Sequence, residues 1–155
     1  MSVADDQLVP RVRVMRHEDV DEVARIESQS YRFPWSLGIF RDCLLAGYHC
    51  LVVDQQVEVR AYSVLSMAAG EAHILNVCVA PAFRRRGYGM LLLNEMIQVA
   101  RESRIRRIFL EVRPSNLAAT SMYHALGFTT IGRRSNYYRA DNNGREDALV
   151  LSLAL

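Results

Sequence analysis

The hydrophobic and polar positions of this chain follow two periods, one typical of strands and one typical of helices. Alternating or continuous apolar runs bounded by polar or glycine turns predict the strands. They are expected at residues 11–15, 48–53, 57–66, 71–80, 107–113, 128–134 and 148–155. The first of these alternates arginine with valine, as an edge strand does.

Two helices are predicted between the first two strands. Asp19 and Glu22 have the spacing of a capping box, which predicts where the first helix begins. The segment Phe33-Pro34-Trp35 ends that helix because proline interrupts helical hydrogen bonding. Ser36 is expected to cap a second, short helix that ends near Gly47.

Two further helices are predicted in the second half of the chain. A helix from near Gly87 to Arg101 has apolar residues at i, i+3, i+4 and i+7. These residues are Leu93, Met96, Ile97 and Ala100. Asn116 is expected to cap a last helix that carries Tyr123 on its apolar face and ends at Gly127. Residues 136–145 form the longest polar stretch and are expected to be a loop.

The order of these elements, β-α-α-β-β-β-α-β-α-β-β, predicts the fold class. It is that of an α/β (α+β) domain with helices layered on a mixed, mostly antiparallel central sheet. The 155 residues, half of them hydrophobic, contain no repeat and no linker. We therefore expect residues 1–155 to form a single domain, with residues 1–10 as a flexible N-terminal extension.

Several classes of protein are excluded by what the chain lacks. No apolar run approaches the roughly 18 residues of a membrane helix, and residues 1–8 lack the apolar core of a signal peptide. The three cysteines and four histidines have no metal-ligand spacing, so no metal is expected. Reduced thiols and a cytoplasmic location follow from the same pattern.

The charges of the chain are unevenly distributed. All 19 basic residues are arginines, which excludes a P-loop lysine and a Schiff-base lysine. Residues 1–80 carry 7 arginines and 11 acidic residues, and residues 81–155 carry 12 and 6. A net charge of +6 in the second part favours a polyanionic ligand, either nucleic acid or a cofactor with several phosphates. A solvated arginine face would give the same charge.

The segment Arg84-Arg-Arg-Gly-Tyr-Gly-Met90 follows an apolar strand and opens a helix. Gly87 and Gly89 allow a ligand to approach the backbone, and the helix N-terminus attracts anions. The segment lacks the third glycine of a dinucleotide fingerprint, since position 92 is leucine. An arginine-flanked helix start with glycines used only for packing is the alternative.

Three residues further along could carry chemistry. Glu111 is the one acid in an apolar strand, where a carboxylate can act as a general base. From the segment alone, an ion pair with Arg113 or another arginine is favoured instead. Asn116 is first of all a helix cap, and the helical spacing of Tyr123 favours a core position.

Together these segments resemble the GCN5-related N-acetyltransferase (GNAT) superfamily and, within it, the bacterial RimI family of ribosomal-protein-alanine N-acetyltransferases. The resemblance extends from about Val12 onward. Its segments are Phe33–Ser36, Arg84–Met90, Leu110–Asn116 with Tyr123, and Asn136–Tyr138 with Gly144–Asp147.

The resemblance implies direct transfer of acetyl from acetyl-CoA to a protein N-terminal amine. It implies that Glu111 is the general base and that Tyr123 is the general acid toward the CoA thiolate. It assigns cofactor binding to Val77, Cys78, Val79, Arg85, Arg86, Gly87, Tyr88, Gly89, Met90 and Asn116.

The resemblance also implies an acceptor, the N-terminal alanine of the eighteenth small-subunit ribosomal protein, and a transient association with the ribosome. Residues expected to shape the peptide site are Trp35, Tyr137, Tyr138, Glu146 and Asp147, with Tyr31 a further wall residue. Each aromatic residue could instead be plain packing, and the two acids could bond Arg145. Neither a membrane nor nucleic acid is expected as a partner. Two other functions stay open: acetylation of a small amine or of other N-termini, and a non-catalytic acetyl-CoA-binding or RNA-associated module.

Overall fold

A computed structural model describes residues 9–155 of the chain. The expectations for a signal peptide and for most of the extension at 1–10 therefore lie outside the described residues. The strands are β1 (Arg11–Val14), β2 (His49–Gln55), β3 (Glu58–Ala68), β4 (Glu71–Val79), β5 (Arg107–Val112), β6 (Thr129–Arg139) and β7 (Arg145–Ala154). The helices are η1 (His17–Asp19), α2 (Val20–Ser30), α3 (Leu37–Leu45), η2 (Pro81–Phe83), α4 (Tyr88–Glu102) and α5 (Leu117–Ala125).

The strands follow the order β1-β2-β3-β4-β5-β7-β6 in one sheet. The pairs β1–β2, β2–β3, β5–β7 and β6–β7 are antiparallel, and β4–β5 is parallel. A parallel pair needs a crossover, and the connection from β4 to β5 contains α4. The predicted order of elements and the predicted α/β class with a mostly antiparallel sheet are confirmed, with β1 at one edge.

The described residues group into two compact units. The first unit contains the chain up to Ser66 together with Asn76–Gln98, and the second contains Met67–Leu75 and Val99–Leu155. The prediction of a single domain stays a prediction, and each unit is described by itself below. Among residues 9–155, no helix is long and apolar enough to cross a lipid bilayer.

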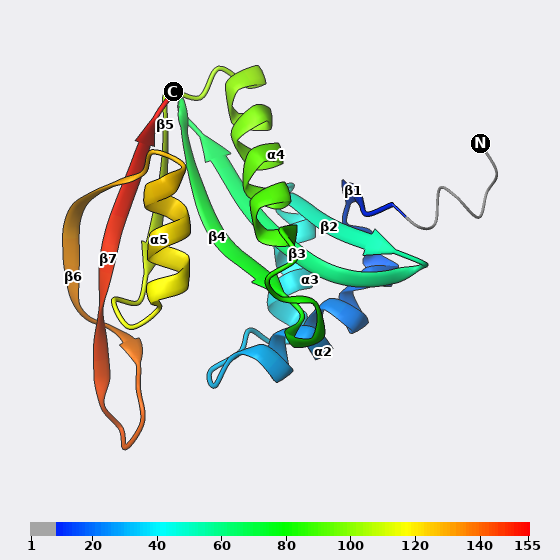
Figure 1. Cartoon of the computed structure of the whole chain (residues 1–155), viewed down its shortest axis with the longest axis horizontal. Coiled ribbons are helices and arrows are strands. Elements are labelled where there is room, and N and C mark those ends of the chain that lie inside the picture. Colours follow the sequence, from blue (N-terminus) through cyan, green and yellow to red (C-terminus); the bar gives the residue numbers. More distant parts are fainter. Residues whose placement is uncertain (1–8) are drawn as a thin grey trace. The chain divides into compact units, whose positions relative to one another are not determined.

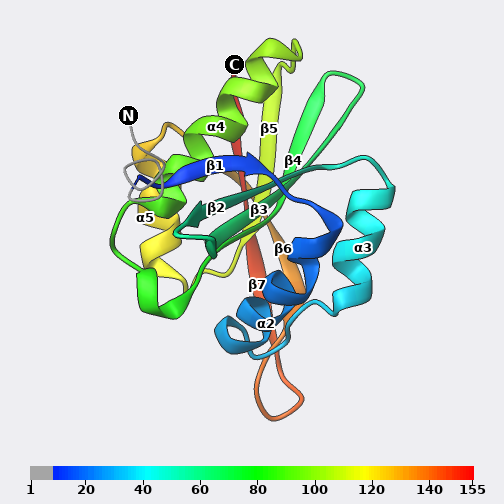
Figure 2. The same ribbon diagram turned by 90° about the vertical axis from the view of Figure 1, so that its right-hand side faces the viewer.

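In the first unit, strands β2 and β3 are buried along most of their length. Figures 1 and 2 show the reason, since α2 and α3 lie on one side of these strands and α4 lies on the other. A strand covered on both faces has no polar alternation, which explains the continuous apolar runs of the sequence. The α4 residues predicted to face the core are buried: Leu93, Met96, Ile97 and Ala100.

The start of α2 differs from the predicted capping box. Asp19 precedes the helix but its side chain makes no cap hydrogen bond. Its carboxylate accepts hydrogen bonds from the guanidinium of Arg13 at 2.8 and 2.9 Å and from the Arg16 N–H at 2.7 Å. Glu22 accepts instead from the Val59 N–H on β3 at 3.2 Å. Asp19 and Glu22 thus bind groups from outside α2 instead of the helix N–H groups that the capping-box spacing predicted.

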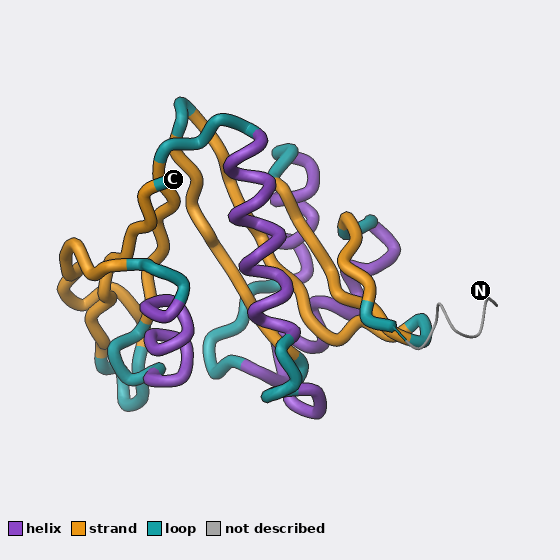
Figure 3. The backbone as a smooth tube through the Cα atoms, turned by 45° about the horizontal axis from the view of Figure 1, so that its top comes forward, coloured by secondary structure: helices purple, strands orange, loops and turns teal. Residues whose placement is uncertain are grey.

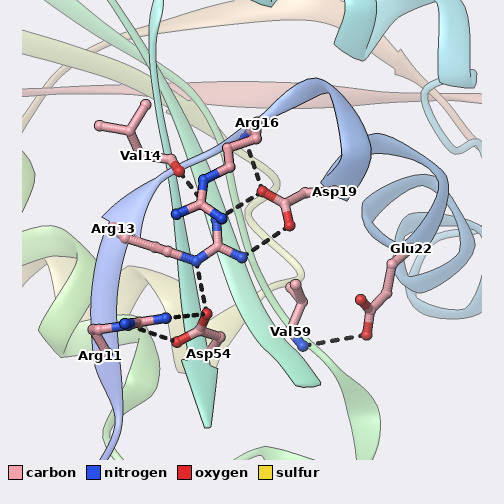
Figure 4. A network of polar contacts seen from close by, with 8 residues as sticks. All are labelled: Arg11, Arg13, Val14, Arg16, Asp19, Glu22, Asp54 and Val59. Atoms are coloured by element: carbon pink, nitrogen blue, oxygen red, sulfur yellow. Dashed lines mark hydrogen bonds and ion pairs between the residues drawn. The ribbon is translucent and has the colours of Figure 1, made fainter. Parts of the chain in front are cut away.

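The same arginine joins β1 to the end of β2 (Figure 4). Arg13 also donates to Asp54 at 2.7 Å, and Arg11 donates to the same carboxylate at 3.2 and 3.3 Å. Asp19 and Asp54 are both buried, so the two arginines compensate carboxylates that have lost most of their water. This network fixes the edge strand and the helix start together.

In the second unit, β7 lies between β5 and β6 (Figure 1), and the β6–β7 hairpin is longer than predicted. The expected loop at 136–145 is wrong, because β6 continues to Arg139 and β7 begins at Arg145. The turn needs only residues 140–144. Asn142 and Asn143 adopt φ of 59° and 57° there, a conformation that asparagine tolerates well.

The turn between β2 and β3 is a smaller correction. The sequence predicts that Val57 begins a strand, but Gln56 and Val57 have φ of 55° and 62° and form the turn itself. Val57 is 88% exposed. A tight hairpin turn requires positive φ at both central residues, and here it overrides the strand preference of valine.

Candidate functional site

The segment between β4 and α4 presents backbone donors and positive charge, and we call residues 84–87 the arginine turn. The turn leads directly into the N-terminus of α4, and Figure 3 shows this change from loop to helix. The first helical hydrogen bond joins the Leu91 N–H to the Gly87 carbonyl at 3.0 Å. The N–H groups of residues 88–90 therefore have no carbonyl one turn earlier in the helix. The three arginines are exposed.

The backbone of the arginine turn is open on its outer side. Gly87 has φ of +86°, and a Cβ built there would meet nothing within 4 Å. Arg85 also has a positive φ of 63°. Consecutive turns of this kind aim N–H groups outward and suit an anion such as a pyrophosphate. Gly89 and Met90 lie in the first turn of α4, as expected for residues that approach the ligand through the backbone.

Tyr88, by contrast, points inward. Its hydroxyl accepts a hydrogen bond from Arg60 Nη1 at 3.0 Å and donates to Gln55 at 3.1 Å. The Arg60 guanidinium also lies 4.1 Å from the centre of the Phe83 ring. Arg60 is buried on β3 and supports the arginine turn through these contacts with Tyr88 and Phe83, the residues on either side of the turn. The sequence did not predict this role. The position of Arg60 inside an apolar strand was the available signal.

The end of β4 that was expected to bind the cofactor is fixed from two sides. The Val77 carbonyl accepts a hydrogen bond from the Tyr31 hydroxyl at 3.0 Å. The Val79 carbonyl accepts from Arg84 Nε at 3.3 Å. The Cys78 side chain is buried. The structure therefore connects the segment after α2 and the arginine turn to the same three residues of β4.

Glu27 is a buried carboxylate that the sequence analysis did not single out. It is 2% exposed and accepts three hydrogen bonds: from the Tyr62 hydroxyl at 2.7 Å, from Asn76 Nδ2 at 3.0 Å and from the Trp35 N–H at 3.0 Å. Burial is the largest cause that raises the pKa of Tyr62 far above its usual value, so this phenol remains a donor. An acid on the apolar face of α2, one residue after Ile26, was the available signal.

Trp35 and Tyr31 are held near this carboxylate. The Trp35 ring packs on Phe40 with centroids 5.4 Å apart, so part of its role is core packing. Because Glu27 binds both the Trp35 backbone and Asn76 of β4, it connects the Phe-Pro-Trp-Ser segment to the cofactor strand. The expectation that Trp35 lines a peptide site stays a prediction.

In the second unit, Glu111 lies on β5 with only 9% of its side chain exposed. The expected ion pair with an arginine is present, but its partner is Arg134 and not Arg113. One carboxylate oxygen contacts His73 Nε2 on β4, and the other lies 3.4 Å from Arg134 Nε on β6. His73 pairs across the parallel register with Phe109, two residues before Glu111, which places both side chains on one face of the sheet. The sequence analysis did not identify His73.

Arg113 has other partners. Its guanidinium donates to Glu146 at 3.1 Å and lies 4.5 Å from the centre of the Tyr138 ring. Burial, and then the neighbouring Tyr137 and Glu111, raise the pKa of Tyr138 well above that of a free phenol. Tyr138 thus lies within electrostatic reach of Glu111.

Tyr137 and Tyr138 pack edge to face with ring centroids 4.8 Å apart. Tyr137 is 46% exposed and has the Arg134 guanidinium 5.7 Å from its ring centre. Arg134 therefore connects the exposed Tyr137 to the carboxylate of Glu111. That Tyr137 contacts a bound peptide stays a prediction.

Tyr123 is buried in α5, and its ring packs on Phe128 with centroids 5.7 Å apart. Burial raises the pKa of Tyr123 to about 12. The hydroxyl therefore keeps its proton over the whole physiological range. Tyr123 is both a core residue, as its spacing suggested, and a permanent hydrogen-bond donor.

Asn116 caps α5 as predicted, with Oδ1 accepting from the Ala119 N–H at 3.2 Å. The two acids of the Gly-Arg-Glu-Asp segment do not bond Arg145. Glu146 binds Arg113 and the Ser115 N–H, while Asp147 binds Arg133 and the Asn136 N–H. These contacts lower the pKa of both carboxyls, through Ser115 first for Glu146 and through Asn136 first for Asp147. That these acids bind a basic peptide residue stays a prediction.

Within residues 9–155, no three of the His, Cys, Asp and Glu side chains are grouped so that they could hold a metal ion. The first unit contributes a helix N-terminus flanked by exposed arginines, and the second contains a shielded carboxylate in contact with an imidazole.

The comparisons agree with this chemistry. Residues 15–128 match the acetyltransferase (GNAT) family. The ribosomal protein bS18-alanine N-acetyltransferase of Escherichia coli strain K12 is 32% identical over 137 residues, which cover 88% of this chain and 92% of that protein. The enzyme of that name from Haemophilus ducreyi is 31% identical over 144 residues, covering 93% and 99%.

A solved structure extends the match to three dimensions. The crystal structure of the ribosomal-protein-S18-alanine N-acetyltransferase from Escherichia coli superposes with a TM-score of 0.88 at 30% identity. The superposition covers 94% of each chain. The chain therefore belongs to the acetyltransferase (GNAT) family, whose members take the acetyl group from acetyl-CoA.

Proposed function

We propose that the chain transfers the acetyl group of acetyl-CoA to the N-terminal α-amine of a protein, and that its substrate is ribosomal protein bS18 with an N-terminal alanine. The observation that carries this proposal is the similarity to bS18-alanine N-acetyltransferases over nearly their whole length. The reaction would take place in the cytoplasm, where ribosomes assemble, and would involve a transient encounter with the ribosome.

Glu111 is the proposed general base. Its carboxylate is shielded from water, faces His73 and Arg134, and lies on β5, between β4 and β7. An α-amine has a reference pKa of about 7.7–8.0, so a sizeable fraction is neutral near neutral pH and a carboxylate is a sufficient base. A lysine amine, near 10.4, would require a stronger one.

Tyr123 is the proposed donor to the leaving thiolate. General acid catalysis is most efficient when the pKa of the acid lies near the operating pH. Burial raises the pKa of Tyr123 to about 12, which is further from the reference pKa of a thiol, about 8.5, than the pKa of a free phenol is. Its hydroxyl therefore stabilises the thiolate first as a hydrogen-bond donor. It supplies a proton only as negative charge develops on sulfur.

The arginine turn and the start of α4 are the proposed phosphate site. Acetyl-CoA, when bound, supplies the activated acetyl thioester. Outward N–H groups of residues 88–90, the open position at Gly87 and the exposed Arg85 and Arg86 fit a pyrophosphate in charge and shape. Residues 77–79 are proposed to hold the pantetheine arm, and Asn116 is proposed to combine its capping role with a cofactor contact.

The peptide site is proposed to include Trp35, Tyr137 and Tyr138, with Glu146 and Asp147 orienting a basic second residue. Because Glu146 already binds Arg113 and Asp147 already binds Arg133, each would act as part of its own ion pair and not as a free charge. The N-terminal sequence Ala-Arg would suit such a pair of sites.

The proposal is tested by incubating the purified chain with acetyl-CoA and peptides that begin Ala-Arg, Ala-Glu or Gly-Arg. Mass spectrometry reads the product. We expect a single acetyl group on the α-amine of the Ala-Arg peptide, and none when that amine is blocked. Acetylation of polyamines in place of peptides would establish the small-amine function, and the absence of any transfer would favour a non-catalytic module.

A further inference from the structure

The contact between His73 and Glu111 is not explained by the fold alone. His73 lies on β4 with 37% of its side chain exposed, whereas Glu111 is 9% exposed on the neighbouring strand. The imidazole therefore connects a shielded carboxylate to solvent. Within residues 9–155, His73 and Arg134 make ion-pair contact with Glu111, and of these two groups only His73 can accept a proton.

The other groups that face Glu111 cannot carry a proton away. Arg134 on β6 lies 3.4 Å from the second carboxylate oxygen, but a guanidinium has no free lone pair to accept with. Tyr138, also on β6, interacts with Glu111 electrostatically, and burial raises its pKa well above that of a free phenol. On β7, the residue opposite Glu111 is Val150, which does not titrate.

We propose that His73 is a proton-relay residue that acts through Glu111, taking the proton that the base removes from the acceptor amine and releasing it to solvent. This inference rests on the proposed function, because it assigns the fate of a proton in that reaction.

The proton balance requires such an exit. An α-ammonium loses two protons when it becomes an amide, while a C–N bond forms and the thioester C–S bond breaks. One proton ends on the CoA sulfur, and the other must reach solvent. In the proposed path it passes from Glu111 to Nε2 of neutral His73, and His73 then gives up its Nδ1 proton to water. Glu111 is then a carboxylate again, and exchange with water returns the remaining imidazole proton from Nε2 to Nδ1, which restores both groups for the next amine.

A second role of the contact is geometric. A carboxylate held by an imidazole on one oxygen and approached by a guanidinium on the other has a fixed orientation on its strand. His73→Ala removes both the orientation and the relay. His73→Gln keeps a side-chain amide that can donate to Glu111 but cannot carry a proton, so the two variants separate the two roles.

The test measures kcat, KM and the pH–rate profile for wild type, both His73 variants and the control His17→Ala. His17 is an exposed histidine of η1 in the first unit. We expect kcat to fall by at least about tenfold in both His73 variants, toward the lower end of general acid–base effects, with KM for acetyl-CoA unchanged. Added imidazole should restore the rate of His73→Ala in proportion to its concentration, and should not affect wild type or His17→Ala.

Three results would overturn the relay. The first is a native kcat in His73→Ala. The second is full activity in His73→Gln, which would leave His73 only an orienting role. The third is a loss of kcat in His73→Ala that imidazole does not restore, although circular dichroism shows a native fold. Failure of the proposed function looks different, since wild type itself would then not acetylate N-terminal peptides. In that case the same variants are compared on whichever amine wild type accepts.

Discussion

The hydroxyl of Tyr62 donates a 2.7 Å hydrogen bond to Glu27 in a part of the first unit where both side chains are shielded from water. With Asn76 and the Trp35 N–H, this makes three donors and no acceptor around one carboxylate. A glutamine in the same position would bring two N–H groups that have no acceptor there.

We therefore expect Glu27→Gln to destabilise the protein in spite of its nearly identical shape. Leaving a buried donor unpaired costs about 1–3 kcal/mol, and urea unfolding monitored by circular dichroism measures it. Glu18→Gln, at an exposed position before α2, is the matched control and should change the unfolding free energy little. Equal midpoints for wild type and Glu27→Gln would show that an amide serves these three donors as well as the carboxylate does.

The arginine–aspartate network of β1 and η1 predicts a loss of stability in acid. The Arg13 hydrogen bonds are the largest cause that lowers the pKa of Asp19; for Asp54, burial acts to raise the pKa and the bonds from Arg11 and Arg13 outweigh it. A lowered folded-state pKa gives stability that is complete above the unfolded value of about 3.9 and is lost as the pH falls through the folded value.

The unfolding free energy of the wild type should thus fall steeply below about pH 4. Asp19→Asn should be less stable at pH 7 and show a weaker dependence on pH in the acid range. Urea titrations at several pH values measure both quantities. Parallel pH curves for wild type and variant would exclude Asp19 as a source of acid sensitivity.

The arginine turn predicts a cofactor-specific increase in thermal stability. Ligand at 100 times its Kd adds about 2.7 kcal/mol, which corresponds to about 5–10 °C for a chain of this size. Acetyl-CoA should give this shift in Tm, whereas NAD and ATP should give much less. Equal shifts for all three would contradict the assignment of the turn to CoA.

The two glycines of this segment should respond differently to substitution. Gly89 lies inside the first turn of α4, so Gly89→Val should mainly block the approach of the ligand to the backbone. Gly87 has a left-handed backbone, so Gly87→Val should also lower the Tm of the free protein. Calorimetry with and without acetyl-CoA separates the two effects, and normal binding by Gly89→Val would mean that this glycine serves packing alone.

The proposed base and donor make separate predictions for the rate. Glu111→Gln should lower kcat by about 10²–10⁴-fold, with partial recovery at high pH because the acceptor amine then deprotonates without help. Peptide acetylation at each pH, with Tm measured in parallel, tests this. A loss of turnover that only follows a loss of folding would remove Glu111 from the mechanism.

Tyr123→Phe should lower kcat and leave acetyl-CoA affinity nearly unchanged, because only the hydroxyl is lost. Since burial raises the pKa of Tyr123 to about 12, the wild-type rate should show no alkaline decline from this phenol near pH 10. A decline at the pKa of a free tyrosine would mean that Tyr123 is more accessible in solution than its 8% exposure indicates.

The sequence predicted those parts of the fold that depend on local patterns. The apolar spacing in α4 and the caps at Ser36 and Asn116 are local features, and the structure has all of them. The capping box at Asp19 was wrong because an arginine from β1 offered a stronger partner than the helix N–H groups did. The loop after residue 135 was wrong because strand pairing with β7 outweighed a polar composition.

The candidate site was predictable only in part, for a similar reason. Glu111, Tyr123 and the arginine turn belong to continuous motifs, so sequence alone located them. His73, Arg134 and Glu27 act through partners 38, 23 and 49 residues away in the chain, and no local spacing reveals such contacts. What remained visible was a polar residue inside an apolar element, which is a useful signal for such positions.

Strand β6 is the last in the sheet order and is exposed along almost its whole length. Its pairing with β7 shifts register twice, and Asn136 bends the strand with a φ of 53°. An unpaired strand edge is a template for intermolecular pairing and aggregation, and natural proteins protect such edges with irregular register and charge. The arginines at 133, 134 and 139 supply that charge here. We therefore expect the long hairpin that carries Tyr137 and Tyr138 to resist edge-to-edge polymerisation at high protein concentration.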